Sequence, residues 1–383
     1  MKMKAAIDLG NGYVKGNVNG EVLSFPSVVA TPKKSSLEVS EAETDEMMDR
    51  LIDKMAVSFI SEAVSSTKPY IFNEQALSSG RPLLEFNVFD KITKAQNDLT
   101  TILILATIAQ NALVSQYKQT GQLGNVAVEA KLVTALPIDE IKLYKQAFIQ
   151  KLAQQEHTIV FNNFYKKVTV TINFEKIMVI SEGEAAQYAL KLANEQFKAV
   201  IEKECRNKQP ELDMSVDDIL SAKNTLGIDI GEGTIDFPVF NDGKFNQEAS
   251  SSINVGFGNL LEAVADDLNY PSRKTITEFL QRDVTAITQN KRNKIMIALE
   301  DNSEDFVDTI NKAITKVISK TGENLEAIFV YGGGATPLES LLFDRIKAHA
   351  ASASDNDVPI VYLDSQYSRM LNLSGLVAIV EKL

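Results

Sequence analysis

Residues 226–237 read LGIDIGEGTIDF, and the interpretation of the whole chain starts from them. Ile228 and Ile230 are β-branched residues on either side of Asp229, which is typical of a buried strand, and a strand pattern resumes after Gly233. The stretch therefore predicts two strands joined by a tight, glycine-bearing turn. Glycine in such a turn permits positive φ and lets backbone N–H groups approach a phosphate closely, because no Cβ intervenes.

The same pattern occurs once more near the N-terminus. Residues 6–18 read AIDLGNGYVKGNV, and residues 227–239 read GIDIGEGTIDFPV. At one constant offset, the matched pairs are Ile7 and Ile228, Asp8 and Asp229, Gly10 and Gly231, and Gly12 and Gly233. Average residue usage places one D-x-G-x-G by chance in roughly one chain in ten of this length. Two copies in matching strand contexts therefore indicate an internal duplication.

Composition indicates an ordinary globular protein. The chain has 383 residues, 44% of them hydrophobic and 23% charged, which is enough for two or more domains with separate cores. The net charge of −12 disfavours direct, sequence-independent binding of nucleic acid, which needs Lys and Arg. Cys205 is the only cysteine, so an intrachain disulfide is excluded and a reducing cytoplasm is expected. Asp8 interrupts the N-terminal apolar run, and no apolar run is long enough to span a bilayer.

Lys15 and Glu182 are polar residues with two interpretations each. Lys15 follows the first glycine turn, and is either an ammonium for the β- and γ-phosphates or an exposed lysine at a strand end. Ser181 can cap a helix with Glu184 three residues later, which places Glu182 at the start of that helix. Glu182 then either complements the helix dipole or orients a water molecule beside a phosphate. The residues alone leave both choices open.

Two further glycine clusters precede predicted helices. Gly256 and Gly258 come just before an apolar-periodic helix, where they either approach a nucleotide or form a plain N-terminal turn. Residues 327–338 read AIFVYGGGATPL, a strand that runs into three glycines and then a helix. Without a lysine followed by Ser or Thr, this is not a P-loop. Three glycines leave bare backbone on which an adenine or ribose could lie; the alternative is a structural strand-to-helix turn. His157 and His349 lack neighbouring nucleophiles or ligand spacing, so metallohydrolase and Ser/His chemistry find no support.

These motifs, in this order, resemble those of the actin-like ATPase superfamily, which includes heat-shock chaperone ATPases and sugar kinases. The segments that resemble its phosphate-1, connect-1, phosphate-2, adenosine and connect-2 motifs are residues 8–15, 181–186, 229–236, 330–335 and 372–376. Within the superfamily the chain looks most like the ParM-type bacterial actins that segregate plasmids, through VTALP at 133–137, SEGEAA at 181–186 and SQY at 365–367. It departs from that family at Ser181, which replaces a proline, at Glu232, where glycine is common, and in a longer segment 199–223.

The resemblance implies an α/β, actin-like fold of two duplicated, ribonuclease-H-like domains with a nucleotide cleft between them. Domain I would comprise residues 1–181 plus 366–383, with a small subdomain at about 31–98. Domain II would comprise residues 182–365, with a small subdomain at about 256–323.

The resemblance also implies roles for individual residues. Glu182, with Asp229, would position the attacking water. Asp8 and Asp229 would hold Mg²⁺, largely through water. The implied phosphate-binding residues are Gly10, Asn11, Gly12, Tyr13, Lys15, Gly231, Glu232, Gly233 and Thr234. The implied adenosine-binding residues are Gly256, Gly258, Gly332, Gly333, Gly334 and Ala335.

The function implied is that of a cytoplasmic, Mg²⁺-dependent ATPase, with GTP left open as the nucleotide. It would polymerise head to tail on binding nucleotide and move plasmid DNA through a ParR-type adaptor, while hydrolysis destabilises the filament. Neither direct nucleic-acid binding nor membrane attachment is expected. Two alternatives stay open on the same fold: a sugar or acetate kinase, for which no sugar-binding carboxylate is evident, and a cell-shape or division actin homologue.

Overall fold

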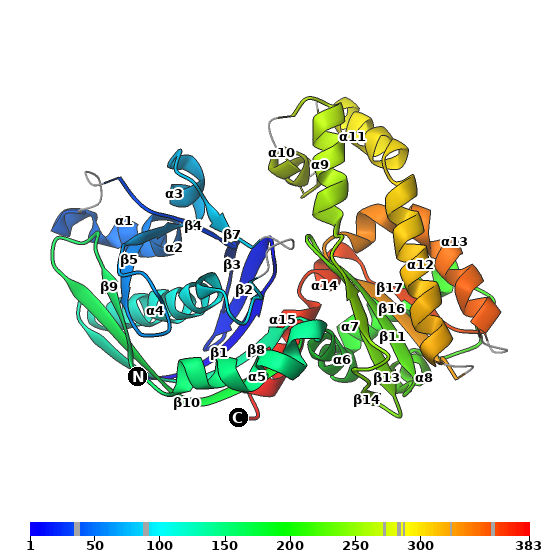
Figure 1. Cartoon of the computed structure of the whole chain (residues 1–383), viewed down its shortest axis with the longest axis horizontal. Helices are drawn as coiled ribbons and strands as arrows, with labels where there is room; N and C mark the ends of the chain where they lie inside the picture. Colours follow the sequence, from blue (N-terminus) through cyan, green and yellow to red (C-terminus); the bar gives the residue numbers. More distant parts are fainter. Residues whose placement is uncertain are drawn as a thin grey trace. The chain divides into compact units, whose positions relative to one another are not determined.

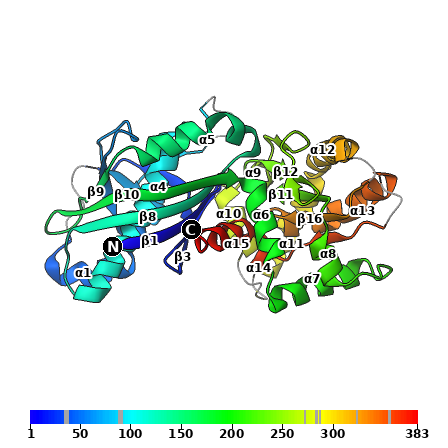
Figure 2. The ribbon, with the colours of Figure 1, turned by 90° about the horizontal axis from the view of Figure 1, so that it is seen from below.

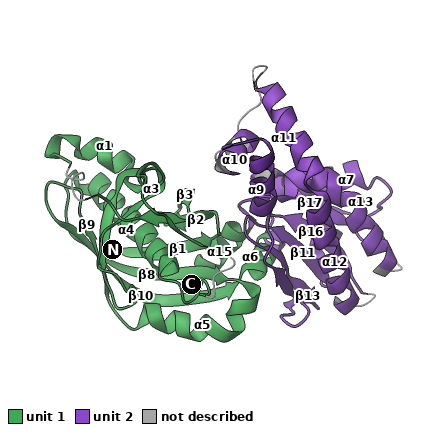
Figure 3. Ribbon diagram, turned by 45° about the horizontal axis from the view of Figure 1, so that its top comes forward, with its two compact units in different colours: residues 1–189, 372–383 green, residues 190–371 purple. Residues whose placement is uncertain are grey.

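The structure is a computed structural model, and it describes residues 1–33, 39–86, 92–270, 273–281, 285, 288–321, 324–353 and 357–383. The chain divides into two compact units, residues 1–189 with 372–383 and residues 190–371 (Figure 3). The sequence-based boundaries, after residues 181 and 365, fall slightly before these. The second unit is therefore one continuous segment inserted into the first.

The first unit is built on a large mixed sheet, with β1 and the parallel strands β8 and β10 at its centre (Figure 1). The strand order is β3-β2-β1-β8-β10-β9-β5-β6-β4-β7. The bounds are β1 Lys2–Leu9, β2 Tyr13–Val18, β3 Glu21–Pro26, β4 Val28–Ala30, β5 Ala56–Ile60, β6 Tyr70–Phe72, β7 Leu84–Glu85, β8 Val126–Leu136, β9 His157–Phe161 and β10 Val168–Ser181.

Helices of the first unit pack on this sheet. Their bounds are α1 Thr44–Asp49, α2 Leu51–Lys54, α3 Asn73–Ser78, α4 Asp98–Thr120, α5 Ile138–Ala153, α6 Glu182–Lys191 and α15 Leu371–Val380, with a short 3₁₀ helix at Glu41–Glu43. α4 contacts β2, β8, β9 and β10. By length and composition alone it could cross a membrane, but 78% of its most apolar window is buried. This burial is that of a core helix.

The second unit has its own sheet, in which β11 pairs with β12 and β13 on one side and with β16 on the other. Its strands are β11 Thr225–Ile230, β12 Ile235–Phe237, β13 Val239–Asn241, β14 Lys244–Phe245, β15 Ser251–Ile253, β16 Ala327–Tyr331 and β17 Ile360–Tyr362. Its helices are α7 Glu195–Lys208, α8 Val216–Ser221, α9 Phe257–Asp267, α10 Arg273–Gln281, α11 Gln289–Asp301, α12 Glu304–Thr321, α13 Ala335–Ala353 and α14 Ser365–Ser368.

The two sheets contain the same succession of five strands. In the first unit the order β3-β2-β1-β8-β10 has antiparallel pairs up to β1 and parallel pairs beyond it. In the second unit β15-β12-β11-β16-β17 repeats this order with the same strand directions. In each unit a long helix also precedes the strand that pairs in parallel with the hairpin: α4 precedes β8, and α12 precedes β16. This shared topology agrees with the internal duplication that the paired hairpins predict.

β10 corrects one detail of the sequence-based prediction. The sequence pattern divides it into two strands, 168–174 and 176–180, but the structure has one strand with a register shift between Phe174 and Lys176. Figure 2 shows β10 lying alongside β8. The strand ends at Ser181, so it delivers Glu182 directly to the start of α6. Proline is well suited to the first turn of a helix, which is where the sequence pattern places Pro137, but in the structure it precedes α5 as its N-cap.

α6 and α15 lie against each other with almost no space between their backbones. A Cβ added to Gly375 would overlap the carbonyl group of Ala185. Both helices cross the boundary between the units in sequence, α6 after Ala189 and α15 after Leu371. Glycine is therefore required at 375 by close approach of the two helices.

Candidate functional site

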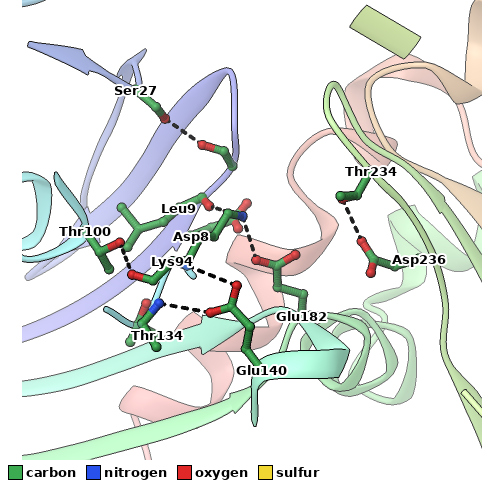
Figure 4. Close-up of polar contacts among 12 residues, drawn as sticks. Asp8, Leu9, Ser27, Lys94, Thr100, Thr134, Glu140, Glu182, Thr234 and Asp236 are labelled. Atoms are coloured by element: carbon green, nitrogen blue, oxygen red, sulfur yellow. Dashed lines mark hydrogen bonds and ion pairs between the residues drawn. The ribbon is translucent and has the colours of Figure 1, made fainter. Parts of the chain in front are cut away.

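The first turn, between β1 and β2, is tied down through its carbonyl groups. The Gly10 N–H donates to the Tyr13 carbonyl at 3.0 Å, and a Cβ at Gly10 would lie 2.9 Å from that oxygen. Gly10 does not use the positive φ that glycine permits, and close approach to the Tyr13 carbonyl is what requires glycine here. The Ser27 hydroxyl donates to the Gly10 carbonyl at 2.7 Å (Figure 4), and its N–H donates to the Gly12 carbonyl at 2.9 Å. Among the described residues, the N–H groups of Asn11 and Gly12 are left as donors for an anion.

Asp8 and Lys15 face each other across this hairpin. They are paired in the register of β1 and β2, and the Lys15 Nζ lies 3.1 Å from Asp8 Oδ2. The Asp8 side chain is buried and that of Lys15 is half-buried, so Lys15 is not an exposed strand-end lysine. The pair places one positive and one negative group directly beside the turn.

The second turn, between β11 and β12, repeats this construction with other partners. The Gly231 N–H donates to the Thr234 carbonyl at 3.0 Å, and a Cβ at Gly231 would lie 2.8 Å from that oxygen. The N-terminus of α9 fastens the turn, because the Phe257 N–H donates to the Gly231 carbonyl and the Gly258 N–H to the Glu232 carbonyl, each at 2.8 Å. In each turn two carbonyl groups, which would repel an anion, are thus occupied by neighbouring elements.

Asp229 and Asp236 face each other where the first hairpin has Asp8 and Lys15. They are paired in the register of β11 and β12, and both are buried. The Thr234 hydroxyl donates to Asp236 Oδ2 at 3.2 Å (Figure 4). Burial and the two nearby carboxylates raise the pKa of the Tyr331 hydroxyl well above its usual value. Asp236 is absent from the predicted site, although the constant offset between the two motifs already aligns it with Lys15.

Glu232 turns its carboxylate toward α10. Its Oε1 lies 3.2 Å from one terminal nitrogen of Arg273. The other terminal nitrogen of Arg273 lies 3.3 Å from the Glu262 carboxylate. The stem of Glu232 passes over Gly258, where a Cβ would lie 2.9 Å from Glu232 Cγ. The negative charge that departs from the ParM-type pattern is therefore held by an arginine.

Close packing explains why most of the predicted adenosine-binding positions are glycine. Gly256 and Gly258 are buried, and a Cβ at Gly258 would lie 2.7 Å from the Glu232 carbonyl oxygen. Gly332 has φ +97°, and a Cβ there would lie 2.6 Å from the Ile230 carbonyl oxygen. Gly334 and Ala335 are buried too, and a Cβ at Gly334 would lie 2.6 Å from Phe257 Cβ. Gly333 differs, because it is exposed and a Cβ there would meet nothing within 4 Å.

Glu182 begins α6, as predicted, and its partner is a residue that the sequence did not indicate. The Glu184 carboxylate accepts from the Ser181 N–H at 3.4 Å, which is one half of the expected capping arrangement. The Ser181 hydroxyl has no hydrogen-bond partner among the described residues. Glu182 Oε1 accepts from Lys94 Nζ at 3.0 Å, in a pair whose side chains are only 13% and 11% exposed. Lys94 lies outside every recognisable motif, so only the tertiary structure reveals it.

The predicted residues fall into two groups, one in each unit. The first unit brings together Asp8, Gly10, Asn11, Gly12, Tyr13, Lys15 and Glu182, around the ends of β1 and β10. The second unit brings together Asp229, Gly231, Glu232, Gly233, Thr234, Gly256, Gly258, Gly332, Gly333, Gly334 and Ala335, around the ends of β11 and β16. Within the described residues no three His, Cys, Asp or Glu side chains form a ready-made metal cage.

Two family models match successive parts of the chain. A model of the N-terminal domain of actin-like proteins matches residues 6–184. A model of the C-terminal domain of the archaeal, MreB-like actin homologue matches residues 227–344. The two matches contain the two glycine hairpins, the start of α6 and the turn at Gly332–Ala335. The chain therefore belongs to the actin-like proteins.

Solved structures of actin-like proteins have the same fold over essentially the whole chain. The actin-like protein Alp7A has a TM-score of 0.64 at 16% identity, with 100% of this chain and 97% of that chain covered. ParM of Bacillus thuringiensis with ATP has a TM-score of 0.61 at 16% identity, with 100% and 99% covered. Ta0583, an archaeal actin homologue in complex with ADP, has a TM-score of 0.61 at 14% identity, with both chains covered completely. No curated protein matches the chain in sequence.

Proposed function

We propose that the chain is a cytoplasmic, Mg²⁺-dependent ATPase of the ParM type. It polymerises on binding nucleotide and moves plasmid DNA through an adaptor, and hydrolysis destabilises the filament. The observation that carries the proposal is the repeated turn, in which two carbonyl groups are occupied by neighbouring elements in each unit. The proposal is also supported by similar structures of actin-like proteins, which were solved with ATP, AMPPNP or ADP.

Each turn offers a separate cradle for phosphate groups. In the first unit, the amides of Asn11 and Gly12 donate to phosphate oxygens while the Lys15 ammonium supplies a positive charge. In the second unit, Gly233 is the corresponding amide donor. Gly10 and Gly231 have a different role from the predicted one, because their N–H groups already close the hairpins. Gly333 is the residue on which bare backbone is open to the base or ribose.

The carboxylates beside the turns fit Mg²⁺. This ion prefers oxygen ligands, keeps several waters, and takes only one or two carboxylates beside substrate phosphates. Asp229 and Asp236 supply two buried carboxylates at facing positions, and Asp8 supplies a third group that Lys15 partly neutralises. When bound, the ion neutralises charge that develops on the phosphates. In the second unit Asp229 would hold it, with Asp236 as a neighbour, and in the first unit Asp8 is the candidate.

Glu182 orients the water for hydrolysis. The water oxygen forms a bond to the γ-phosphorus, the bond to the bridging oxygen breaks, and ADP leaves with that electron pair. One proton of the water passes through the carboxylate to solvent. Positioning and charge compensation of this kind supply most of the catalysis of phosphoryl transfer.

Self-association and the adaptor are the remaining parts of the proposal. A head-to-tail contact joins different surfaces of identical subunits, and it therefore generates an open filament. One similar structure is a non-polymerisable mutant of pCBH ParM, with a TM-score of 0.60 and 18% identity. The net charge of −12 fits an attachment to DNA through a second protein.

The test combines light scattering with phosphate release after ATP and Mg²⁺ are added, followed by electron microscopy. We expect scattering and filaments with ATP, and phosphate release without any added sugar; a parallel run with GTP sets the nucleotide preference. A panel of sugars and acetate is the control for the kinase alternative. Phosphorylated sugar or acetate without polymer would replace the proposal by that alternative.

Glu182→Gln tests the catalytic assignment. It keeps the size of the side chain but removes the charge, so phosphate release is expected to slow by about 100-fold or more. Assembly with ATP should persist and the polymer should last longer. Lys142→Gln, an exposed position on α5, is the control. Unchanged phosphate release in Glu182→Gln would remove Glu182 from the catalytic role.

A further inference from the structure

Lys94 makes two contacts that join separate parts of the candidate site. It lies a few residues before α4, and its ammonium donates to the Leu9 carbonyl at 2.8 Å and to Glu182 Oε1 at 3.0 Å. Leu9 is the last residue of β1, directly before the first turn, and Glu182 is the first residue of α6. Figure 4 shows the ammonium between the two oxygen atoms. One nitrogen atom therefore sets the separation between the turn and the carboxylate.

The backbone around Lys94 is fastened independently of its ammonium. Its own N–H and that of Ala95 donate to the two carboxylate oxygens of Glu140 at 3.0 and 2.9 Å. Its carbonyl accepts from the Thr100 hydroxyl at 2.5 Å. Glu140 lies in the first turn of α5, and Thr100 in the first turn of α4. Two helices thus hold the segment, and the lysine stem starts from a fixed point.

The electrostatics make Lys94 the counter-charge of this region. Burial raises the pKa of the Glu140 carboxyl, while the N–H groups of Ala95 and Lys94 and the ammonium charge oppose the rise. The negative charge of Glu182 also raises the pKa of the Glu140 carboxyl, because the two carboxylates repel each other. Removing one partner of a buried pair leaves an uncompensated charge, which is strongly unfavourable.

One oxygen of Glu182 stays outside this network. Oε1 is bound by Lys94, whereas Oε2 accepts no hydrogen bond from any residue that the structure describes. A carboxylate has acceptor capacity on both oxygens. With Oε1 held, the orientation of the group is set, and Oε2 is available to a water molecule.

We propose that Lys94 is the positioning residue of Glu182, holding Oε1 against the end of β1 so that Oε2 orients the attacking water. This inference rests on the proposed ATPase function. Lys94 differs from Lys15 in this role. Lys15 pairs with Asp8 inside the hairpin, whereas Lys94 acts through Glu182 and the Leu9 carbonyl.

The experiment measures kcat and KM for ATP hydrolysis, together with nucleotide affinity and Tm. In Lys94→Met the carboxylate loses its fixed orientation, so kcat is expected to fall by about 100-fold. KM and nucleotide affinity should stay within about threefold of the wild-type values, because the amides of Asn11 and Gly12 are untouched. Lys94→Arg should recover part of kcat, since a guanidinium donates to the same two oxygens.

Lys151→Met is the matched control. Lys151 lies on α5 and pairs with Asp98 at 3.3 Å, so this change also removes a lysine–carboxylate pair beside the start of α4, without contact to Glu182. Its kcat should equal that of the wild type. Lys94→Gln guards against a folding defect in Lys94→Met, because the amide keeps a donor while it removes the charge. A wild-type kcat in Lys94→Met would overturn the proposal.

The double variant Lys94→Met with Glu182→Gln separates positioning from a general structural effect. If Lys94 acts through Glu182, the double variant should have the kcat of Glu182→Gln within a factor of about two. If the fold-loss of kcat in the double variant equals the product of the losses in the two single variants, Lys94 acts independently of Glu182, and the proposal would fail. If Glu182→Gln slows turnover but Lys94→Met does not, this inference alone fails. If the wild-type protein releases no phosphate from ATP, the proposed function fails with it.

Discussion

Glu232 shows how one residue can be accommodated where its charge is unfavourable. It lies in the second turn at the position of Asn11 in the first, beside the predicted phosphate site. Arg273 lies 3.2 Å from the Glu232 carboxylate in a half-buried ion pair, and it also pairs with Glu262. A half-exposed pair of this kind contributes little to stability by itself. Its main consequence is that the charge of Glu232 is compensated.

Arg273→Met is therefore expected to weaken nucleotide binding and to leave folding largely unchanged. Loss of the Arg273 charge removes an attraction for the phosphate that offsets Glu232, and two unit charges at 4 Å in water interact by about 1 kcal/mol, which is roughly fivefold in Kd. Titration with a fluorescent ATP analogue gives the value. Glu232→Gln combined with Arg273→Met should restore the affinity. If the double variant binds as weakly as Arg273→Met, charge is not the cause.

His157 predicts a dependence of stability on pH. It is completely buried, its Nε2 lies 2.8 Å from the Leu152 carbonyl, and its Nδ1 lies 2.8 Å from the Ser61 hydroxyl. Burial lowers the pKa of this imidazole, and the hydrogen bond to Leu152 opposes the shift. The unfolded chain therefore takes up a proton below about pH 6.5 while the folded chain does not.

The free energy of unfolding should accordingly fall as pH decreases below about 6.5, by at most about 1.4 kcal/mol per pH unit from this group. Denaturant unfolding at a series of pH values measures the slope. His157→Gln is the reference variant: it should be less stable at neutral pH, with a shallower decline on acidification. Equal slopes in both proteins would show that other groups dominate.

Residues differ in how well sequence predicts their place. Glu182 follows from its position at a strand end before a helix, which local patterns indicate. Lys94 does not, because its contacts come from residues far away in the chain. Asp236 was predictable from the aligned motifs and was missed. Sequence shows that glycine permits both a positive φ and a close approach of the backbone, and only the structure shows that close approach is the reason for glycine at Gly10 and Gly231.

At the scale of elements, apolar periodicity predicted most strands and helices. The sequence pattern predicts a strand over 126–136, which the structure has with these bounds, and apolar residues at helical spacing predict a helix over 98–117, which extends to Thr120. β10 shows the limit of such patterns: a register shift near Lys176 interrupts the alternation of its side chains without ending the strand. Pairing with β8 keeps it continuous, and pairing is a tertiary property.

The strand-to-helix turn after β16 supports a prediction about two neighbouring glycines. Gly332→Ala imposes φ +97° on a residue with a Cβ, directed at the Asp229 carboxylate and the Ile230 carbonyl. We expect the free energy of unfolding to fall by about 3 kcal/mol. Gly333→Ala should be close to neutral, because a Cβ there meets nothing within 4 Å.

Gly333→Ala also tests the predicted adenosine contact. If the base or ribose lies on this backbone, the added methyl group should lower nucleotide affinity while Tm is unchanged. Thermal melting and nucleotide titration of both variants give the comparison. Full affinity in Gly333→Ala would place the nucleoside elsewhere, and equal stability of the two variants would contradict the geometry of the turn.

At the scale of the whole molecule, the duplication was visible in two short motifs only. The strand order shared by the two sheets extends it to residues without recognisable similarity. The division into units was less accessible, because α6 and α15 cross both boundaries and continue without interruption. Helical periodicity gives no sign of where one core ends and the next begins.

The contact between Gly375 and Ala185 has a mechanical consequence. The polypeptide leaves the first unit along α6 and returns along α15, and within that unit the two helices touch at Gly375 and the Ala185 carbonyl group. Since the outgoing and returning segments are held together at this point, neither helix can be displaced there without the other. A larger residue at 375 would push the two helices apart inside the first unit, where Ala185 and Leu376 are fully buried.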